Sequence, residues 1–450
     1  MKLDHIHNVY CVGIGGIGMS ALARYFHSRG KVVAGYDKTP SDITQTLCVS
    51  GISVHYEDSV ADIPENFKDK ATTLVIYTPA VPSTHQELQY FKAQDFVLKK
   101  RAEVLGMITK DSFCLAVAGT HGKTTTSCIL AHLLDCRKAA FSAFLGGVSE
   151  DFGSNVVLQG GQYTVVEADE FDRSFLQLSP KVACITAMDA DHLDIYETTG
   201  ELHAAFEDFA QKLSDQGTLL VRNGLPIAGI TYGIDDESDY CICHVAVQNG
   251  AYTFDIKTPE QCIEGVTFHK PGRHNLLNAL AAFAMAVEIG FAPSALARDL
   301  ASFKGVQRRF TYHLKSSAFA FVDDYAHHPV EIAAVYQALT EMHPGKALTA
   351  VFQPHLYSRT RDFAEDFAKE LSRFDQVLLL EIYPAREEPL PGVSSSWLLE
   401  MMDHPQKKLV SKANLIEEIT QCEPQILVTM GAGDIGLEVP KIKTALAHES

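Results

Sequence analysis

The sequence lacks the features of several familiar classes of protein. Its 450 residues include ten cysteines, none in a C-x-x-C pair, which excludes zinc and dithiol redox sites of that spacing. No uninterrupted apolar run approaches about 18 residues, so no membrane-spanning helix is expected. The first residues carry no apolar signal core. We therefore expect a cytoplasmic protein with reduced cysteines and no membrane insertion.

Basic residues are scarce relative to acidic ones, at 38 against 56, and the net charge is −18. This balance argues against a nucleic-acid partner, because such a protein needs a basic surface. It leaves room for a phosphorylated ligand held by a few local cations and backbone amides. The hydrophobic fraction of 46% and the charged fraction of 21% are ordinary globular values.

Short apolar runs alternate with helical patterns along most of the chain. Strands are expected at Val32–Tyr36 and Leu74–Tyr77, and the helix Met19–Ser28 precedes them, which predicts a parallel sheet. The pattern restarts at the strand Phe113–Ala118 and again near Tyr312. We therefore predict an α/β protein with three domains, over residues 1–108, 109–312 and 313–450.

Two segments refine this organisation. Residues Tyr240–Phe268 are β-like and predict a small antiparallel insertion, and the alanine-rich run Asn275–Ile289 predicts a helix. The C-terminal strands are expected at Ala318–Val322, Leu348–Phe352, Val377–Leu380 and Ile426–Met430.

The first glycine loop, G-x-G-x-x-G, stands between an apolar strand and a helix. Its glycines allow the backbone to approach a pyrophosphate at the helix N-terminus. Asp37 follows the next strand, where a dinucleotide-binding fold places an acid that binds ribose. The loop indicates a nucleotide diphosphate, and NAD and a UDP-sugar satisfy it equally. The residues of this loop are Gly13, Gly15, Gly16 and Gly18.

The second loop resembles a P-loop, although Val117 stands where the usual first glycine would be. Its backbone amides, Lys123 and the Thr124 hydroxyl are the groups that bind phosphates and Mg²⁺. It therefore predicts ATP or GTP binding. The residues concerned are Gly119, Thr120, His121, Gly122, Lys123, Thr124 and Thr125. A chain with both loops is expected to bind two phosphorylated ligands, with ATP activating a group carried on a nucleotide.

Acidic clusters follow the next two strands, at the sheet edge where α/β proteins bind ligands. Glu167 and His192 are the predicted metal ligands, because Mg²⁺ on phosphates accepts a few carboxylates and sometimes a neutral histidine. We expect Glu170, Asp172 and Asp189 to be solvated or to cap helices. Two metal ions would neutralise the repulsion between ATP and a second anion.

The remaining clusters are less specific. His355 and Arg359 would share a face if helical, where they either pair with a carboxylate substrate or are solvated. The adjacent His327 and His328 do not predict zinc, because neighbouring histidines rarely face one ion. No G-x-S-x-G motif or Cys/His pairing indicates a nucleophile.

Taken in order, these segments resemble the Mur ligases of peptidoglycan precursor synthesis, and among them the alanine-adding branch. The resemblance covers essentially the whole chain. Its motifs are GIGGIGMSALA at Gly13–Ala23, GTHGKTTT at Gly119–Thr126, EADEFDRSFL at Glu167–Leu176, DADHLDIY at Asp189–Tyr196, GRHNLLNALAA at Gly272–Ala282, RRF at Arg308–Phe310, DDYAHHP at Asp323–Pro329, QPHLYSRTRD at Gln353–Asp362 and GAGDI at Gly431–Ile435.

The resemblance implies a Rossmann-like N-terminal domain for a UDP-sugar, a central P-loop domain for ATP and a Rossmann-like C-terminal domain that admits the amino acid. Lys123 would bind the phosphates, Thr124 and Glu167 one Mg²⁺, and His192 a second, with Mn²⁺ able to substitute. His274 and Asn278 would border the adenine. The residues near the reacting groups would be Arg309, Asp324, Tyr325, His327, His328, His355 and Arg359.

The implied partners are UDP-N-acetylmuramate and L-alanine. The lactyl carboxylate would take the γ-phosphate of ATP, and the amine of alanine would then displace phosphate from the acyl phosphate. The segment Phe206–Asp208 lacks the lysine that sister ligases carbamylate, in agreement with the alanine-adding branch. Leu356 departs from the basic residue that some alanine ligases have after the QPH histidine.

Three alternatives remain at this stage. A murein-tripeptide recycling ligase shares the chemistry with a larger acceptor. An NAD-dependent oxidoreductase would use only the first loop and Asp37. A nucleotide-gated binding protein would use both loops without catalysis.

Overall fold

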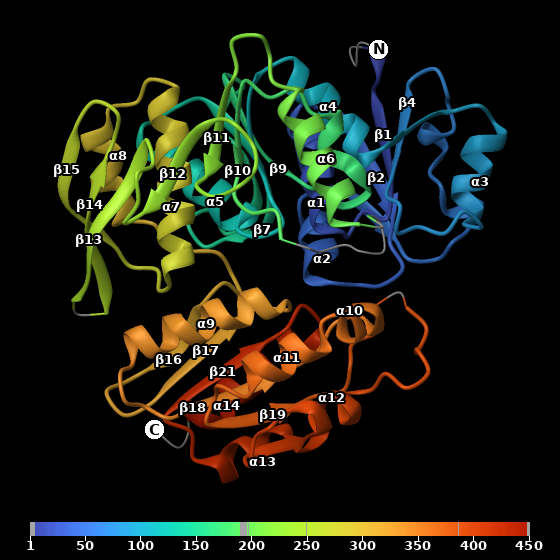
Figure 1. Cartoon of the computed structure of the whole chain (residues 1–450). Helices are drawn as coiled ribbons and strands as arrows, with labels where there is room; N and C mark the ends of the chain where they lie inside the picture. The colour runs from blue at the N-terminus through green and yellow to red at the C-terminus, as the bar shows by residue number, and fades with distance from the viewer. Residues whose placement is uncertain (1–4, 190–195, 197, 249, 386, 448–450) are drawn as a thin grey trace. The chain divides into compact units, whose positions relative to one another are not determined.

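A computed structural model of the chain describes residues 5–189, 196, 198–248, 250–385 and 387–447, without the side chain of Asp172. The chain forms two compact units (Figure 1). Unit 1 comprises residues 1–241 and 279–299, and unit 2 comprises residues 242–278 and 300–450. Among the described residues, no helix combines the length and the apolar character needed to cross a membrane. No disulfide joins the ten cysteines.

The N-terminal part of unit 1 is a parallel sheet with strand order β3-β2-β1-β4-β5. β1 is buried along its whole length, and its neighbours β2 and β4 are mostly buried, as expected for strands covered on both faces. The strands are β1 (Asn8–Val12), β2 (Val32–Tyr36), β3 (Ser53–His55), β4 (Thr73–Tyr77) and β5 (Val97–Lys100). The helices are α1 (Ile17–Ser28), α2 (Asp42–Val49), α3 (Gln86–Ala93) and α4 (Arg101–Lys110).

The strands of the second sheet that lie in unit 1 follow the order β12-β11-β10-β6-β9-β7-β8. These strands are parallel except for β8, which pairs antiparallel with β7. The strands are β6 (Phe113–Ala118), β7 (Phe141–Ser149), β8 (Ser154–Leu158), β9 (Tyr163–Ala168), β10 (Val182–Ile185), β11 (Thr218–Arg222) and β12 (Ile230–Ile234). The helices are α5 (Lys123–Cys136) and α6 (Thr199–Ala210), with the short 3-10 helix η4 (Phe171–Gln177).

Helix α1 links the two sheets of unit 1 through one hydrophobic core. Met19 and Leu22 of α1 belong to the same buried cluster as Phe144 of β7 and Val156 of β8. The side-chain amide of Asn155 also donates to the Ile17 carbonyl at 2.6 Å. Close packing of this kind resists relative movement of the two sheets.

Unit 2 begins in β13 (Tyr240–Gln248), and the chain passes between the units again within α7 (Arg273–Glu288) and at the end of α8 (Pro293–Leu300). Strands β14 (Ala251–Lys257) and β15 (Cys262–Phe268) pair antiparallel. The larger sheet of unit 2 has the order β16-β17-β21-β18-β19-β20 and is parallel except for β16.

The strands of this larger sheet are β16 (Thr311–Lys315), β17 (Ala320–Asp324), β18 (Leu348–Phe352), β19 (Gln376–Leu379), β20 (Lys407–Leu409) and β21 (Ile426–Met430). The accompanying helices are α9 (Pro329–Met342), α10 (Tyr357–Asp362), α11 (Ala364–Leu371), α12 (Ser395–Met401), α13 (Leu415–Cys422) and α14 (Val439–Ala447). The predicted α/β class is confirmed, with a parallel N-terminal sheet and mixed sheets after it.

Candidate active site

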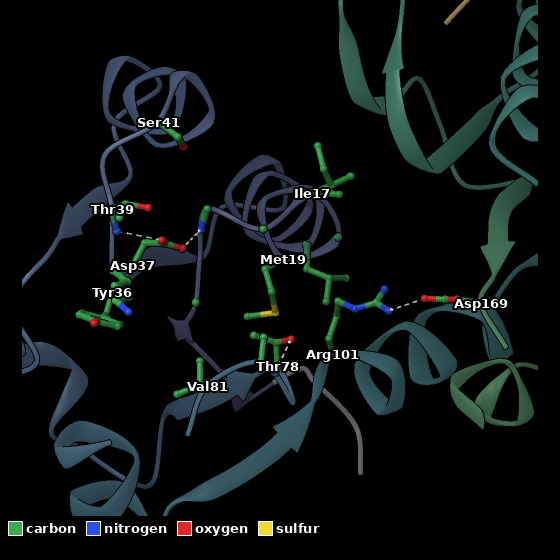
Figure 2. Close-up of a pocket in the computed structure, with 18 of the residues that line it drawn as sticks. Ile17, Met19, Tyr36, Asp37, Thr39, Ser41, Thr78, Val81, Arg101 and Asp169 are labelled. Atoms are coloured by element: carbon green, nitrogen blue, oxygen red, sulfur yellow. Dashed lines mark hydrogen bonds and ion pairs between the residues drawn. The ribbon is translucent and has the colours of Figure 1, made fainter. Parts of the chain in front are cut away.

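The first glycine loop connects the end of β1 to the start of α1. Gly13 has φ +86°, and a Cβ there would lie 2.8 Å from the Thr78 methyl group, so only glycine fits. The N–H of Gly15 donates to the Asp37 carboxylate at 2.7 Å (Figure 2). Asp37 therefore holds the loop against the end of β2, as well as standing where the sequence predicts a ribose ligand.

A cavity of about 970 Å³ opens at this loop (Figure 2). Its walls come from the carboxyl ends of the first sheet and, on the other side, from β7 and the end of β9. Gly13, Gly15, Gly16, Gly18 and Asp37 all line it, together with Glu167 and Asp169. The cavity thus runs from the first predicted phosphate loop to the acidic cluster that follows the second.

Arg101 is a cavity residue that the sequence reasoning missed. Its guanidinium lies against the glycine loop, 2.9 Å from where a Cβ on Gly18 would be, and 4.0 Å from the Asp169 carboxylate. The signal in the sequence is the basic run Lys99–Arg101, which lies where strand β5 ends. A guanidinium beside a glycine loop is well suited to bind a pyrophosphate.

The P-loop connects β6 to α5. Gly119 has φ +135°, and a Cβ there would lie 2.2 Å from the Thr186 hydroxyl, so glycine is required. Gly122, with φ +83°, caps the N-terminus of α5. The Thr120 hydroxyl accepts from the Asp189 N–H at 3.1 Å, and the His121 carbonyl accepts from the Thr186 hydroxyl at 2.5 Å. The segment therefore has the strand–loop–helix form that phosphate binding needs.

Lys123 forms an ion pair with Glu170, a residue expected from the sequence to be solvated or to cap a helix. Its ammonium group lies 2.7 and 2.9 Å from the two oxygens of Glu170 and 2.6 Å from the Gly119 carbonyl. Burial lowers the pKa of Lys123, but the charges of Glu170, Asp169 and Glu167 outweigh it and leave the pKa above its usual value. Glu170 is 0% exposed, and although it stands at the N-cap position of η4 its side chain makes no capping hydrogen bond, so the prediction that it is solvated or caps a helix was wrong.

The P-loop makes another side-chain contact, between Thr124 and Glu167. The Thr124 hydroxyl lies 2.9 and 3.0 Å from the two oxygens of the Glu167 carboxylate. Gly146 of β7 leaves room for that carboxylate, because a Cβ there would lie 2.0 Å from it. Thr125 is buried beside them in α5. His192 lies outside the described residues, and the Asp189 side chain keeps 44% of its surface exposed.

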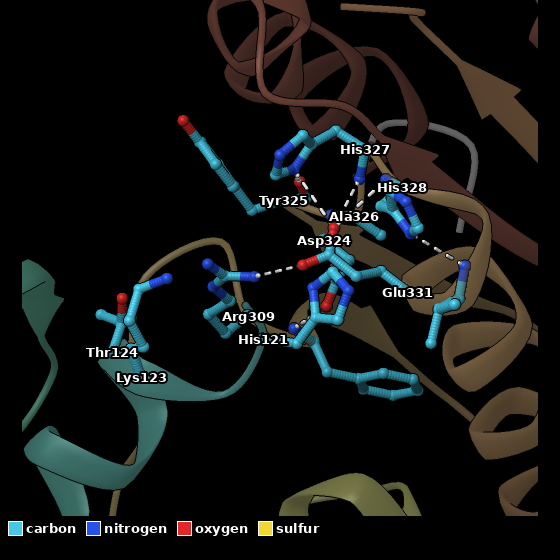
Figure 3. Close-up of polar contacts among 12 residues, drawn as sticks. His121, Lys123, Thr124, Arg309, Asp324, Tyr325, Ala326, His327, His328 and Glu331 are labelled. Atoms are coloured by element: carbon cyan, nitrogen blue, oxygen red, sulfur yellow. Dashed lines mark hydrogen bonds and ion pairs between the residues drawn. The ribbon is translucent and has the colours of Figure 1, made fainter. Parts of the chain in front are cut away.

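Unit 2 brings together a separate group of predicted residues around the end of β17 (Figure 3). Both oxygens of Asp324 accept backbone N–H bonds at 2.7 Å, from Phe310 and from Ala326. Burial raises the pKa of Asp324 to about 6, despite the opposing effects of Arg309 and of these two bonds. The Arg309 guanidinium lies 5.0 Å from the centre of the Tyr325 ring.

The side chains of the histidines in this group make different contacts. His327 lies 3.2 Å from the Glu331 carboxylate, and His328 caps α9 by accepting from the Val330 N–H at 3.4 Å. His355 precedes α10 rather than lying on it, because the helix begins at Tyr357. Even so, its Nδ1 is 3.4 Å from the buried Arg359 guanidinium. Leu356, the next residue after His355, has a positive φ of +71°.

His274 and Asn278, predicted to border adenine, lie on α7 in the part that belongs to unit 2. Burial, followed by the charge of Arg309, lowers the pKa of His274 to about 4, so the imidazole is neutral. The Asn278 amide lies 3.4 Å from the Asn275 side-chain oxygen. A neutral ring and a buried amide are groups that can contact a heteroaromatic base.

Comparison with known proteins identifies the family. Residues 8–113 match the description "Mur ligase family, catalytic domain", residues 117–286 match "Mur ligase middle domain" and residues 308–437 match "Mur ligase, glutamate ligase domain". A protein of Christiangramia forsetii named UDP-N-acetylmuramate–L-alanine ligase is 55% identical over 449 residues, covering 100% of this chain and 99% of its own. The chain belongs to the Mur ligase family.

Further Mur ligases support this assignment. A protein of Porphyromonas gingivalis with the same name is 46% identical over 449 residues, 97% of this chain and 98% of its own. Among solved structures, the UDP-N-acetylmuramate–alanine ligase of Thermotoga maritima superposes with a TM-score of 0.82 at 26% identity, covering 98% of this chain and 100% of that one. The three-domain α/β fold of the Mur ligases is therefore confirmed. A murein peptide ligase of Psychrobacter arcticus, at 21% identity, TM-score 0.68 and 98% coverage of both chains, shares the fold.

Proposed function

We propose that this chain is an ATP-dependent ligase that joins L-alanine to the lactyl carboxylate of UDP-N-acetylmuramate. The observation that carries the proposal is the cavity of unit 1, which extends from the glycine loop to Glu167. Glu167 in turn contacts Thr124 of the P-loop. A cavity that reaches both phosphate loops suits phosphoryl transfer from one nucleotide to a group carried on the other. The names of relatives at 55% and 46% identity support this substrate pair.

The proposal assigns each loop one ligand. The glycine loop, Asp37 and Arg101 bind the UDP part of the sugar nucleotide, and the P-loop binds ATP with Lys123 on its phosphates. The three domain ranges expected from the sequence, 1–108, 109–312 and 313–450, remain part of the proposal. In this proposal the amino acid binds to the last of these domains, residues 313–450.

The residues beside the P-loop fit Mg²⁺. A hydroxyl and a carboxylate within 3.0 Å of each other are oxygen donors of the kind this ion prefers, and the hydroxyl belongs to the phosphate loop itself. Thr124 and Glu167 would hold one ion, and His192 a second. The ions would neutralise the negative charge of the phosphates, a role that Mn²⁺ can also fill.

In the proposed reaction the lactyl carboxylate attacks the γ-phosphorus of ATP, and ADP leaves. The neutral amine of alanine then attacks the acyl carbonyl, the C–O bond to phosphate breaks, and the amine gives up one proton. Lys123, Arg309 and Arg359 supply positive charge for the phosphates and carboxylates. Asp324 acts by position, because its two bonds to backbone N–H groups hold the residues that directly follow Arg309 and Tyr325.

The deciding experiment offers the enzyme ATP, UDP-N-acetylmuramate and one of two acceptors, alanine or the L-alanyl-γ-D-glutamyl-meso-diaminopimelate tripeptide. We expect ADP release to be faster with alanine. Faster release with the tripeptide would support a recycling ligase instead. Thermal protection by NAD, without protection by the sugar nucleotide, would favour an oxidoreductase, and no phosphate release with all three substrates would indicate a binding protein.

Separate binding sites for ATP and the sugar nucleotide can be tested by replacing Lys123. Lys123→Ala is expected to abolish ATP turnover and to leave the affinity for UDP-N-acetylmuramate largely unchanged, because the glycine loop lies on a different sheet. Isothermal titration with each nucleotide separately measures the two affinities. An equal loss of both would show that the two sites are not separate.

A further inference from the structure

Three potential metal ligands lie together in unit 2, and none of them has a role in the proposed reaction. They are Cys243 and His244 on β13 and Asp255 on β14. One ligand atom from each lies within 4.8 Å of the other two. The sequence shows no sign of this cluster, because Cys243 has no C-x-x-C partner.

Two irregularities in the strands create the cluster. Successive residues of a regular strand face opposite sides of the sheet, so Cys243 and His244 would normally point apart. His244, however, has φ +55°, a left-handed conformation that breaks the alternation. On the neighbouring strand, the register with β15 shifts between Phe254 and Ile256, at Asp255. Irregularities of this kind redirect side chains, and here they bring the three donor atoms to one place.

Asp255 is already oriented for a ligand. One oxygen of its carboxylate accepts from the N–H of Gly265 on β15 at 2.9 Å, and the other lies 2.7 Å from Nδ1 of His244. Carboxylates that bind metals are commonly fixed by such a second hydrogen bond. The His244 side chain is 81% exposed, so an ion can reach the cluster from solvent.

We propose that Cys243, His244 and Asp255 form a binding site for a single Zn²⁺-type cation, with water completing the coordination. Sulfur, nitrogen and carboxylate oxygen are the donors that Zn²⁺ uses, and three protein ligands plus water is an established arrangement. Binding releases the thiol proton of Cys243 and any proton on the imidazole nitrogen that takes the metal. The two negative ligands then balance the charge of the ion.

The test is a titration of the full-length protein with Co²⁺ in the presence of excess Mg²⁺, which occupies oxygen-only sites. A bound thiolate gives a sulfur-to-cobalt charge-transfer absorption that oxygen ligands do not produce. We expect this absorption to saturate at one Co²⁺ per chain and to disappear on addition of Zn²⁺. Absence of the absorption at saturating Co²⁺ would overturn the proposal, and so would saturation at one ion per two chains.

Variants identify the donors. Cys243→Ser should abolish the absorption, and Asp255→Asn should weaken Co²⁺ binding by at least roughly 10-fold, since even loss of an outer hydrogen-bond partner costs that much. Cys262→Ser is the matched control, because Cys262 is an exposed cysteine on the adjacent strand β15. Loss of the absorption in the Cys262 variant, or its retention in the Cys243 variant, would refute the assignment. Circular dichroism verifies that each variant is folded.

Discussion

Replacing Glu170 with glutamine tests the role of the buried ion pair at the P-loop. The Glu170 carboxylate is 0% exposed, and the Lys123 side chain it binds is 12% exposed. Glutamine has nearly the same size and removes the negative charge alone. The ammonium group then keeps the Gly119 carbonyl at 2.6 Å as an acceptor and loses its nearest counter-ion.

The expected cost follows from that geometry. Removing one partner of a buried ion pair typically destabilises a protein by about 3–5 kcal/mol, because the remaining charge is left uncompensated. The glutamine oxygen still accepts one hydrogen bond from Lys123, so we expect the lower end, about 3 kcal/mol. The double variant Lys123→Met/Glu170→Gln removes both charges. Its cost should therefore be smaller than the sum of the two single variants, with a coupling of up to about 3 kcal/mol.

Hydrogen exchange of the α5 amides is the suitable assay, because it reports on unit 1 itself. A loss of about 3 kcal/mol lowers protection there by roughly 100-fold. The single tryptophan, Trp397, lies on α12 in unit 2, and its fluorescence during urea unfolding serves as an internal control that should not change. Protection within a factor of three of the parent protein, or single costs that simply add in the double variant, would refute the ion-pair reasoning.

Three other predictions concern the cavity and unit 2. Glu167→Ala should raise the Mg²⁺ concentration for half-maximal ADP release by at least roughly 10-fold, and an unchanged titration would remove Glu167 from the ligands. Arg101→Gln should raise the KM for the sugar nucleotide roughly 10-fold, since a charge-assisted bond contributes about 1.5–3 kcal/mol, whereas the exposed control Arg29→Gln should not. Asp324 has a raised pKa in the folded state, so its contribution to stability is complete below pH 4 and falls by about 3 kcal/mol as the pH rises to about 6. His274 has a lowered pKa, and its contribution is lost as the pH falls from 6.5 to about 4. The two residues therefore change stability with pH in opposite directions. Asp324→Asn removes one of these effects, so the urea midpoint should rise more steeply between pH 4 and 6 than in the parent protein. Tryptophan fluorescence measures this midpoint, and an unchanged dependence on pH would contradict the prediction.

Much of the fold could be predicted because its signals are local. Strands Val32–Tyr36, Leu348–Phe352 and Ile426–Met430 have the predicted bounds, since each is an apolar run buried in a sheet. The helix expected at Asn275–Ile289 forms over Arg273–Glu288. The antiparallel strand β16 was not predicted, because its half-buried residues show no continuous apolar run.

The site could be predicted where a local sequence motif determines the backbone conformation. It could not be predicted where a contact with a residue distant in the sequence determines how a side chain is buried or placed. The glycine loop and the P-loop have the predicted strand–loop–helix form because each requires glycine at a left-handed position. Glu170 was misjudged because its burial depends on Lys123, 47 positions away in the sequence. Arg101 was missed because a basic run is usually a solvated surface, and only the folded chain places it beside Gly18.

The position of α1 explains why two nucleotide loops can serve one reaction. The glycine loop leads into the N-terminus of this helix, and the helix packs on β7 and β8 of the P-loop sheet. The bond from Asn155 to Ile17 ties the first turn of α1 to β8. Both loops therefore lie within unit 1, and their separation is set by a shared hydrophobic core. In the proposed reaction, this arrangement positions the sugar nucleotide and ATP relative to each other before the amino acid binds.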